Sequence, residues 1–429
     1  SLGERYTEFF IDTWRSEVVL TTFDQLLLAL FSGRTRHLMR CHHLLDALIV
    51  LDEVQTLPCK LWDLADKALN ALTREGAARV LLMSATQPAL LSGARELAGD
   101  EGQVAAVFAL FRRYRIRFCH RQDQDLEAFL AGLSPRLTAW IAAGRRILIT
   151  LNTRASAKAV WRAVAENPEI DVPVHLISAD LTPRDRLEKI MAVKAAKDGP
   201  CVVVSTQTVE AGVDIDMDVT LRDFAPLDAL IQVAGRCNRN NRNGDYGGEV
   251  EIVSLRSRRG RRYAQMIYDP DLLNATHDVL TGLDGIGEDG VLELSRRYFA
   301  LLKQRKDTGT KITRAFARWE EMPDIRELLR GVQRQQLSFL VLDDEPGEEL
   351  RQDMAAALGI QDRWEQRSAL RRLAAAMQQR TVSVFAGRGL DPAEFAEPLG
   401  PFWILHHRFY NRASGLDLNK DEDDPVCIF

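Results

Sequence analysis

Cysteine is scarce in this sequence. The six cysteines are spread over 429 residues, and no two of them form a Cys-x-x-Cys pair. That spacing predicts neither a zinc site nor a framework of disulfides. The sequence also shows no N-terminal signal peptide and no apolar run long enough to cross a bilayer. Together these absences favour a protein of the reducing cytoplasm.

Positive charge is not in excess either. The chain carries 56 basic and 61 acidic residues, which gives a formal net charge of -5. This balance excludes a protein that coats nucleic acid through its overall charge, so any contact with nucleic acid must be local. Apolar residues make up 46% of the chain, so sizeable cores can form. A chain of this length is expected to contain about two to four domains.

The most informative stretch that is present runs from Val202 to Asn241. An apolar strand near its start leads into Thr206, and Gln232-x-x-Gly235-Arg236-x-x-Arg239 follows. Two arginines spaced three residues apart lie on one face of a helix or turn. Core packing does not require them, because arginine is almost never buried without a partner. Binding of a polyphosphate would require them, since guanidinium groups match phosphate oxygens. The structural alternative is that the two arginines form salt bridges on the surface.

Two acids follow an apolar run upstream. Residues 47–54 read ALIVLDEV, which predicts a parallel strand buried on both faces and ending at Asp52 and Glu53. Acids that bind metal or act in catalysis sit where such strands end. A second apolar run, from Leu81, ends in Ser84-Ala85-Thr86. The structural alternatives are a solvated helix start for the acids and a helix N-cap for the serine, with Gln87-Pro88 opening the next element.

The pattern of elements predicts an α/β fold with two tandem parallel sheets. In the first part we expect a strand at 18–20, a helix at 23–31 and a helical stripe within 57–74. In the second we expect strands at 147–151, 174–178, 201–205, 219–222 and 250–255, with helices at 154–165 and 183–196. Thr182-Pro183 is a good helix start. The rest is expected to be mostly helical from 263 to 342, followed by a smaller terminal region with one helix at 347–379.

These motifs resemble those of superfamily 2 helicases. The stretch 202–241 is similar to motifs V and VI, Ser84-Ala85-Thr86 is similar to motif III, and Thr21 to Gln25 is similar to motif Ib. Within this superfamily, the sequence most resembles the CRISPR-associated helicase–nuclease of type I interference systems. The residues that carry this resemblance are Asp52-Glu53-Val54-Gln55 with Leu57-Pro58, residues 206–216, residues 223–228 and the tail 409–416.

The resemblance implies two RecA-like lobes, the first one truncated, with ATP and Mg²⁺ between them. The implied domains are a partial lobe at 1–120, a second lobe at 121–255, a mostly helical linker at 256–345 and an accessory domain at 346–429. Asp52 would hold Mg²⁺ through water, and Glu53 would polarise the attacking water. Arg239 would be the finger on the γ-phosphate, with Arg236 as its neighbour.

Other positions take their expected roles from the same resemblance. Gly212 would let the backbone approach the nucleotide, and Asp214 would bind the ribose or order its loop. Gln55 and Gln232 would link the water and the γ-phosphate to the opposite lobe, while Ser84 and Thr86 would couple nucleotide state to the grip on nucleic acid. Single-stranded DNA would meet the polar side chains of Thr21, Thr22, Asn152, Thr153, Ser178 and Thr206. A capping or turn role competes equally at each of these hydroxyls.

Two parts of the intact relatives have no counterpart in this sequence. No phosphate-binding loop, G-x-x-x-x-G-K-[ST], precedes the acids, and no nuclease centre is expected among the eight histidines, although His277 is followed directly by Asp278. The simplest interpretation is a fragment that lacks the front of the first lobe and the HD nuclease domain, which would be fused or separate. The chain alone is then expected to hydrolyse ATP poorly, and its implied partners are single-stranded DNA and an RNA-guided surveillance complex.

Three alternatives stay open. The motifs also fit another superfamily 2 motor, such as an RNA helicase or a restriction translocase. A scaffold that binds nucleic acid without hydrolysing ATP is the alternative from a different class. Finally, the basic run at 256–262, RSRRGRR, is either a solvated linker or a contact to a phosphate backbone.

Overall fold

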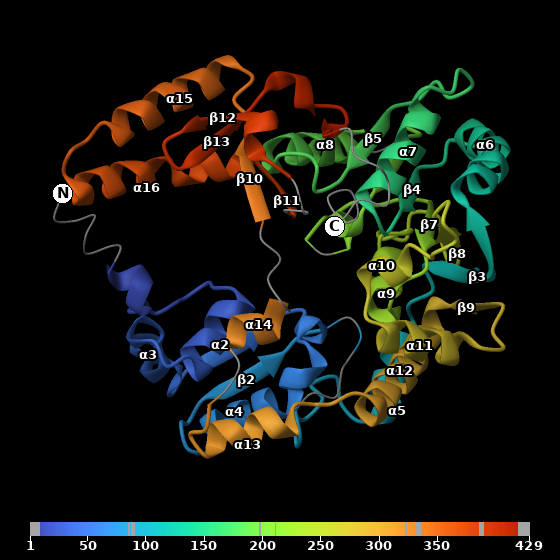
Figure 1. The fold of residues 1–429 in the computed structure, drawn as a ribbon. Coiled ribbons are helices and arrows are strands. Elements are labelled where there is room, and N and C mark those ends of the chain that lie inside the picture. The colour runs from blue at the N-terminus through green and yellow to red at the C-terminus, as the bar shows by residue number, and fades with distance from the viewer. Residues whose placement is uncertain are drawn as a thin grey trace. The chain divides into compact units, whose positions relative to one another are not determined.

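The structure is a computed structural model that describes residues 9–84, 86, 91–196, 199–210, 212–321, 324–330, 336–385 and 390–418 (Figure 1). The chain forms two compact units. The first contains Ser1–Leu110 and Gly290–Gln333, and the second contains Phe111–Asp289 and Arg334–Phe429. No helix among the described residues is both long enough and apolar enough to cross a membrane.

The first unit is built on two parallel strands, β1 (Leu48–Leu51) and β2 (Arg79–Leu82). Helix α4 (Trp62–Arg74) connects them, and α2 (Phe23–Phe31) packs into the same core. The expectation that the strand before Asp52 is buried on both faces is wrong, because Leu48 is 68% exposed. The side chains of β1 alternate between core and solvent. This pattern is typical of a sheet that, among the described residues, is covered on one face.

The expected strand at 18–20 is also wrong. Val18 and Leu20 are 86% and 99% exposed, and this segment joins no sheet that the structure describes. Three apolar residues without a pairing neighbour cannot satisfy their backbone groups as a strand. The helix that follows begins and ends where it was predicted, because the Thr22 hydroxyl accepts a hydrogen bond from the Gln25 amide (3.4 Å) and caps it.

Helices from far along the sequence complete the first unit. They are α12 (Val291–Arg305), α13 (Thr310–Ala317) and α14 (Ile325–Arg330). The rings of Trp62 and Phe299 lie 6.2 Å apart, and those of Phe31 and Phe316 lie 5.3 Å apart. The expected helical linker is therefore divided between the two units. Its earlier part lies in the second unit and contains α10 (Ala264–Ile267) and α11 (Pro270–Leu280). The division into four domains stays a prediction.

The second unit contains a seven-stranded sheet in the order β5-β6-β4-β7-β8-β3-β9. All neighbouring pairs are parallel except β3 with β9. Five of the strands fall at the positions predicted from the sequence. The strands are β3 (Tyr114–Asp125), β4 (Ile147–Thr150), β5 (Val174–Ile177), β6 (Val202–Ser205), β7 (Val219–Asp223), β8 (Gly248–Arg256) and β9 (Gly285–Gly287).

Helices cover both faces of this sheet. Ile147 and Ile149 of β4 pack with α6 (Leu126–Ala142) and α7 (Arg154–Ala165) in one core. Leu148, between them, packs on the other face with α8 (Pro183–Ala195) and α9 (Leu227–Ala234). Alternate residues of a strand point to opposite faces, so one fully buried strand feeds both cores. This is the α/β architecture that the sequence predicts for the second lobe.

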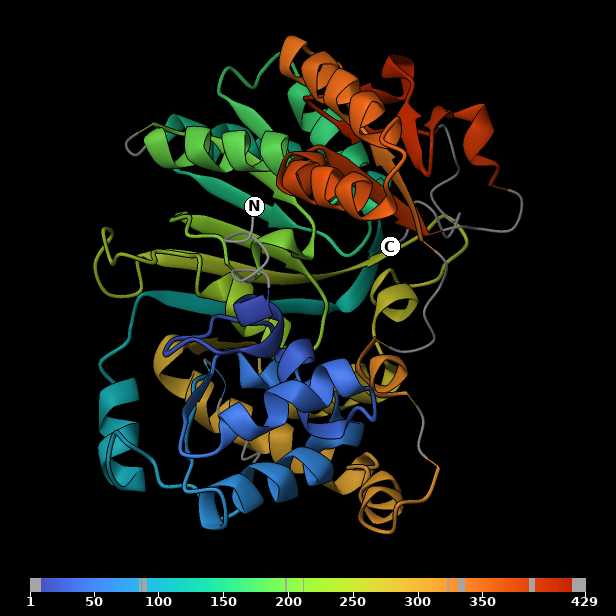
Figure 2. The same cartoon turned by 90° about the vertical axis from the view of Figure 1, so that its left-hand side faces the viewer.

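The terminal region adds a four-stranded sheet in the order β11-β10-β13-β12. The single helix expected at 347–379 is wrong, because α15 (Glu345–Leu358) and α16 (Arg363–Gln379) are separate helices that lie side by side (Figures 1 and 2). The Asp362 carboxylate accepts hydrogen bonds from the Trp364 and Glu365 amides (both 2.9 Å) and starts α16 anew. The strands are β10 (Gln336–Leu340), β11 (Thr381–Phe385), β12 (Ala396–Leu399) and β13 (Phe402–Leu405).

Short elements complete the described chain. The remaining regular elements are α3 (Thr35–Cys41), α5 (Glu101–Phe108), β14 (Tyr410–Asn411) and β15 (Gly415–Leu416). The single-turn 3-10 helices are η1 (His42–Leu44), η2 (Val54–Thr56), η3 (Cys59–Leu61), η4 (Gln207–Val209), η5 (Glu288–Gly290), η6 (Pro392–Glu394) and η7 (His407–Phe409).

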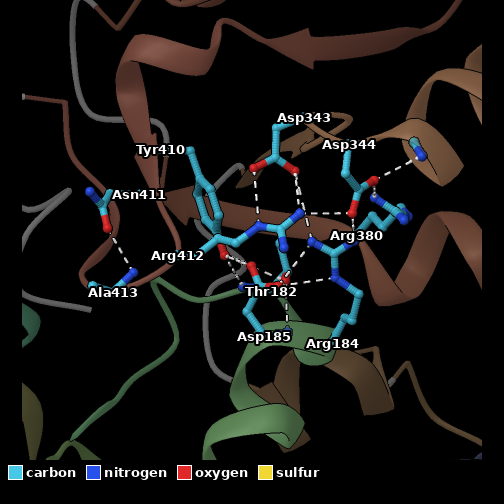
Figure 3. A network of polar contacts seen from close by, with 11 residues as sticks. Thr182, Arg184, Asp185, Asp343, Asp344, Arg380, Tyr410, Asn411, Arg412 and Ala413 are labelled. Atoms are coloured by element: carbon cyan, nitrogen blue, oxygen red, sulfur yellow. Dashed lines mark hydrogen bonds and ion pairs between the residues drawn. The ribbon is translucent and has the colours of Figure 1, made fainter.

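A polar network holds the terminal region to the second lobe (Figure 3). Arg184, in the first turn of α8, pairs with Asp344, and Asp344 also accepts from Arg380 (2.6 Å) and Arg412 (2.7 Å). The Tyr410 hydroxyl accepts from the Thr182 amide (3.0 Å) and donates to Asp185. The start of α8 is therefore capped by a tyrosine from far along the chain.

Candidate nucleotide and nucleic-acid sites

Glu53 has an unusual backbone. Its φ of 54° and ψ of 41° place it in the left-handed region, which residues other than glycine seldom adopt. It follows β1 directly, and its amide donates to the exposed carboxylate of Asp52 (2.9 Å). Such backbone strain persists where surrounding contacts hold it, and it clusters at functional sites. The observed strain therefore marks the residue that the sequence singles out as the catalytic acid.

Gln55 connects this acid to the turn after β2. Its amide nitrogen donates to the Glu53 carboxylate, and its amide oxygen accepts from the Ser84 hydroxyl (2.6 Å). The Ser84 hydroxyl in turn accepts from the Thr86 amide (3.1 Å), which gives it a turn role as well. The Thr86 hydroxyl is buried and has no hydrogen-bond partner among the described residues. The structure thus brings together four of the predicted residues; Ala85, Gln87 and Pro88 lie outside the described residues.

Arg236 is buried at the end of α9. Its Nε donates to the carbonyl of Val209 (3.1 Å) and its Nη2 to the carbonyl of Glu210 (2.6 Å). These contacts brace the loop that carries Gly212, whose φ of 71° is in the region that suits glycine. Gln232, on α9, is half-buried. The guanidinium predicted to neighbour the phosphates is therefore also a structural brace for the glycine loop.

Arg239 is more exposed and pairs with Asp214. The Nε of Arg239 lies 2.9 Å from the Asp214 carboxylate, and Lys194 Nζ lies 3.3 Å from it. The hydrogen bond from Lys194 and its charge, followed by the charge of Arg239, hold the pKa of Asp214 below its ordinary value. The Arg239 amide donates to Asp216 (2.8 Å), which fixes the backbone at this arginine. An exposed ion pair of this kind is weak enough to exchange for a phosphate.

A buried arginine that was not predicted joins several of these loops. Arg222 of β7 is fully buried and donates to Asn152 (2.7 Å), Glu210 (2.6 Å) and the Tyr268 hydroxyl (2.9 Å). Asn152 donates onward to Asp223 (2.7 Å). Burial raises the pKa of Asp223 to about 7, and Arg222 opposes that rise. The only sequence signal was an arginine inside an apolar strand, which requires buried partners.

The predicted DNA contacts occupy different environments. Thr21 and Thr22 are exposed in the first unit. The other four, Asn152, Thr153, Ser178 and Thr206, follow β4, β5 and β6 in the second unit and are buried. Thr153 caps α7 by accepting from the Ser156 amide (3.1 Å), and Ser178 accepts from the Asp180 amide (3.0 Å). These are the capping and turn roles left open by the sequence, and contact with DNA stays a prediction.

The donor atoms at the end of β1 suit Mg²⁺. Asp52 presents an exposed carboxylate, and hard oxygen ligands shared with water are what this ion prefers. Elsewhere among the described residues, no group of three His, Cys, Asp or Glu side chains could hold a metal ion. A single carboxylate fits an ion that is held mainly by water and by substrate phosphates.

The comparisons with known proteins point to one class, the superfamily 2 helicases, as what this chain is similar to. A family model described as the C-terminal part of the CRISPR-associated nuclease/helicase Cas3 matches residues 143–242. The chain is 26% identical over 340 residues to the CRISPR-associated nuclease/helicase Cas3 of Haloferax volcanii, and 28% identical over 259 residues to that of Methanothermobacter thermautotrophicus. These likenesses confirm the predicted resemblance to the CRISPR-associated helicases.

Solved structures show the same fold. The crystal structure of T. fusca Cas3 covers 88% of this chain with a TM-score of 0.62 at 18% identity. A structure titled as an RNA-guided surveillance complex before nicking covers 92% with a TM-score of 0.57 at 17% identity. The matches extend over 59% of this chain but 36% of the Haloferax protein, and over 51% of the T. fusca chain. The chain thus spans about a third to a half of the relatives that it matches.

Proposed function

We propose that the intact protein is an ATP-dependent superfamily 2 translocase that moves on single-stranded DNA in CRISPR interference. The observation that carries the proposal is the strained Glu53, which is linked through Gln55 to Ser84. This geometry places a carboxylate at the end of a parallel strand and ties it to the turn after the neighbouring strand. A carboxylate so fixed can orient a water for attack on a phosphoryl group.

The second unit supplies the cations that such a reaction needs. Arg239 stands in an exposed ion pair, and Arg236 holds the glycine loop in place. In the proposal, ATP displaces Asp214 from Arg239, and the guanidinium stabilises charge on the γ-phosphate. Mg²⁺ held by Asp52 would neutralise charge on the β- and γ-phosphates. No phosphate-binding loop motif occurs among these 429 residues, so the chain alone is expected to hydrolyse ATP poorly.

The expected partners follow from the likeness to a chain in a solved surveillance complex. We infer that an RNA-guided surveillance complex recruits the protein, because one similar chain was solved in such a complex. An HD nuclease domain, fused or separate, would receive the strand that the motor feeds. Another superfamily 2 motor acting on RNA is the alternative that the motifs also permit.

The test uses the full-length protein. ATP hydrolysis should be stimulated by single-stranded DNA more than by RNA, and Arg239→Ala should lower kcat by about 10³-fold or more. Arg242→Ala is the matched control, because Arg242 is equally exposed and pairs with Asp216 in the same loop (2.9 Å). A loss of similar size in both variants, or stimulation by RNA alone, would contradict the proposal.

A further inference from the structure

Five arginines form a hairpin directly after β8. Residues 256–262, here called the arginine hairpin, are closed by an antiparallel bridge between Arg256 and Arg262. The Ser257 amide donates to the Arg261 carbonyl (2.8 Å), and the Gly260 amide donates to the Ser257 carbonyl (2.8 Å). Gly260 has a φ of 78°, which permits the tight turn. The basic run is therefore a built turn rather than a loose linker.

The hairpin borders a hollow of about 900 Å³. Arg256, Ser257, Arg258 and Arg259 line one wall, and the start of α6 forms the other. A space of this size accommodates a nucleotide. Three arginines of the lining face two carboxylates, Asp125 and Glu127, and the Asp125 carboxylate is engaged by the Ala128 amide (2.8 Å). The hollow therefore favours an anion.

A buried hydroxyl in the hairpin lacks a partner. Ser257 is 2% exposed, lines the hollow, and its Oγ makes no hydrogen bond within the described structure. Buried hydroxyl groups are nearly always satisfied, so each exception needs an explanation. Tyr263, immediately after the hairpin, is fully buried and holds the turn in place. A small opening of the turn would let this hydroxyl donate to a phosphate oxygen in the hollow.

The hairpin also lies at the edge of the sheet where DNA contact is expected. β4, β6 and β8 are parallel, so their carboxyl ends meet at one edge of the sheet. Asn152 and Thr206, which follow β4 and β6, are buried, and the Asn152 side chain is already engaged by Asp223 and Arg222. Arg258, Arg259 and Arg261 are exposed at the end of β8. In a chain with net charge -5, a local cationic patch is what binding to a polyanion requires.

We propose that the arginine hairpin and Ser257 bind the phosphate backbone of a single DNA strand. This inference rests on the proposed function and adds a contact to it at the carboxyl edge of the second lobe. The arginines supply charge without reading the bases, so binding should be insensitive to sequence and strongly dependent on salt. A translocating motor needs contacts of this kind, because the same residues must hold each successive phosphate.

The test is binding of a fluorescent oligothymidylate to the 429-residue chain. Arg258→Ala/Arg259→Ala/Arg261→Ala should weaken binding about tenfold or more and reduce the slope of log K against log salt by about 2. The corresponding triple lysine variant should bind nearly as the parent does. Ser257→Ala should weaken binding by a few fold and leave thermal stability unchanged, since the hydroxyl it removes has no partner.

The control removes three exposed arginines of α16 instead. Arg363→Ala/Arg367→Ala/Arg372→Ala changes the net charge equally in the same unit and should leave binding nearly unchanged. Equal weakening by both triple variants would overturn the hairpin site in favour of general electrostatics. Unchanged binding by the hairpin variant, beside a parent that binds, would overturn the hairpin alone. A parent chain that binds no DNA would overturn both this inference and the DNA-directed function.

Discussion

His120 of β3 is a buried histidine kept neutral by its surroundings. It is 6% exposed, its ring stacks on Phe224 with centroids 4.9 Å apart, and its Nδ1 has no hydrogen-bond partner in the part of the chain that the structure describes. Burial, reinforced by the nearby His277, Arg121 and Arg262, lowers the pKa of His120 to about 4 from an ordinary value near 6.5. The charge of Asp123 favours protonation but is outweighed, so the ring behaves as a flat apolar group.

This environment makes stability depend on pH. The unfolded chain takes up the proton near pH 6.5 and the folded chain near pH 4, so the stability is present above about 6.5 and is lost as the pH falls towards 4. The loss is on the order of 3 kcal/mol. His120→Phe should remove it while keeping the stacking, which urea unfolding near pH 5 and near pH 7.5 would measure. His407→Phe, at an exposed histidine, should leave the pH dependence intact; if it flattens the profile equally, the assignment to His120 is wrong.

Arg222 should be far more costly to remove than an exposed arginine. Arg222→Met leaves Glu210 half-buried without the guanidinium that pairs with it, and breaking such a pair costs about 3–5 kcal/mol. Adding Glu210→Gln to this variant should recover part of the loss, because the uncompensated charge disappears. Chemical denaturation of the two single variants and the double variant gives the coupling. Additive losses would show that Glu210 and Arg222 do not depend on each other.

At the scale of elements, local signals predicted most of the second lobe. The helix at 154–165 appears as expected because Thr153 caps it, and the helix after Thr182-Pro183 begins where predicted. These outcomes depend on residues adjacent in sequence. The strand expected at 18–20 failed because a strand requires a distant pairing neighbour. The single helix expected at 347–379 is wrong because Asp362 caps a new helix inside an otherwise helical pattern.

The candidate site was predictable only in part, for the same reason. Glu53 and Arg239 stand in motifs that can be read from adjacent residues. The connection from Gln55 to Ser84 spans 29 residues, and no expectation from the sequence joined these two side chains. Arg222 was missed because nothing near it in sequence identifies Asn152, Glu210 and Tyr268 as its partners. Buried polar networks are satisfied by the fold rather than by the local sequence.

The first turn of α8 depends on Tyr410. Tyr410→Phe removes the acceptor of the Thr182 amide and the donor to Asp185, and it leaves both groups buried. The expected cost is about 1–3 kcal/mol, because an unsatisfied buried group loses its full desolvation energy. A double-mutant cycle with Asp185→Asn, followed by denaturant unfolding, should give a coupling of about 1 kcal/mol or more. Additive effects of the two substitutions would show that the hydroxyl and the carboxylate are not energetically coupled.

At the scale of the whole molecule, one carboxylate links three parts of the second unit. Asp344 accepts from Arg184 of α8, from Arg380 before β11 and from Arg412 near the tail, and it caps α15 through the Gly347 amide (2.9 Å). Burial alone would raise its pKa, but the hydrogen bond from Arg380 and the other donors hold the pKa well below its ordinary value. The group is therefore ionised at neutral pH, and its contribution is lost only as the pH falls below about 4.

Asp344→Asn should loosen the terminal region from the lobe without unfolding either. The amide keeps an oxygen for one donor but loses the charge that three guanidinium groups share, so exchange of amide hydrogens should quicken at the start of α15 and the start of α8 together. Asp343→Asn is the matched control, because its contacts to Arg412 (3.4 Å) and Arg184 (3.8 Å) are longer. Hydrogen exchange followed by mass spectrometry separates the two. Faster exchange at α15 alone would show that Asp344 acts only as a helix cap. Equal effects from both variants would show that the terminal region is attached through the summed charge rather than through this one carboxylate.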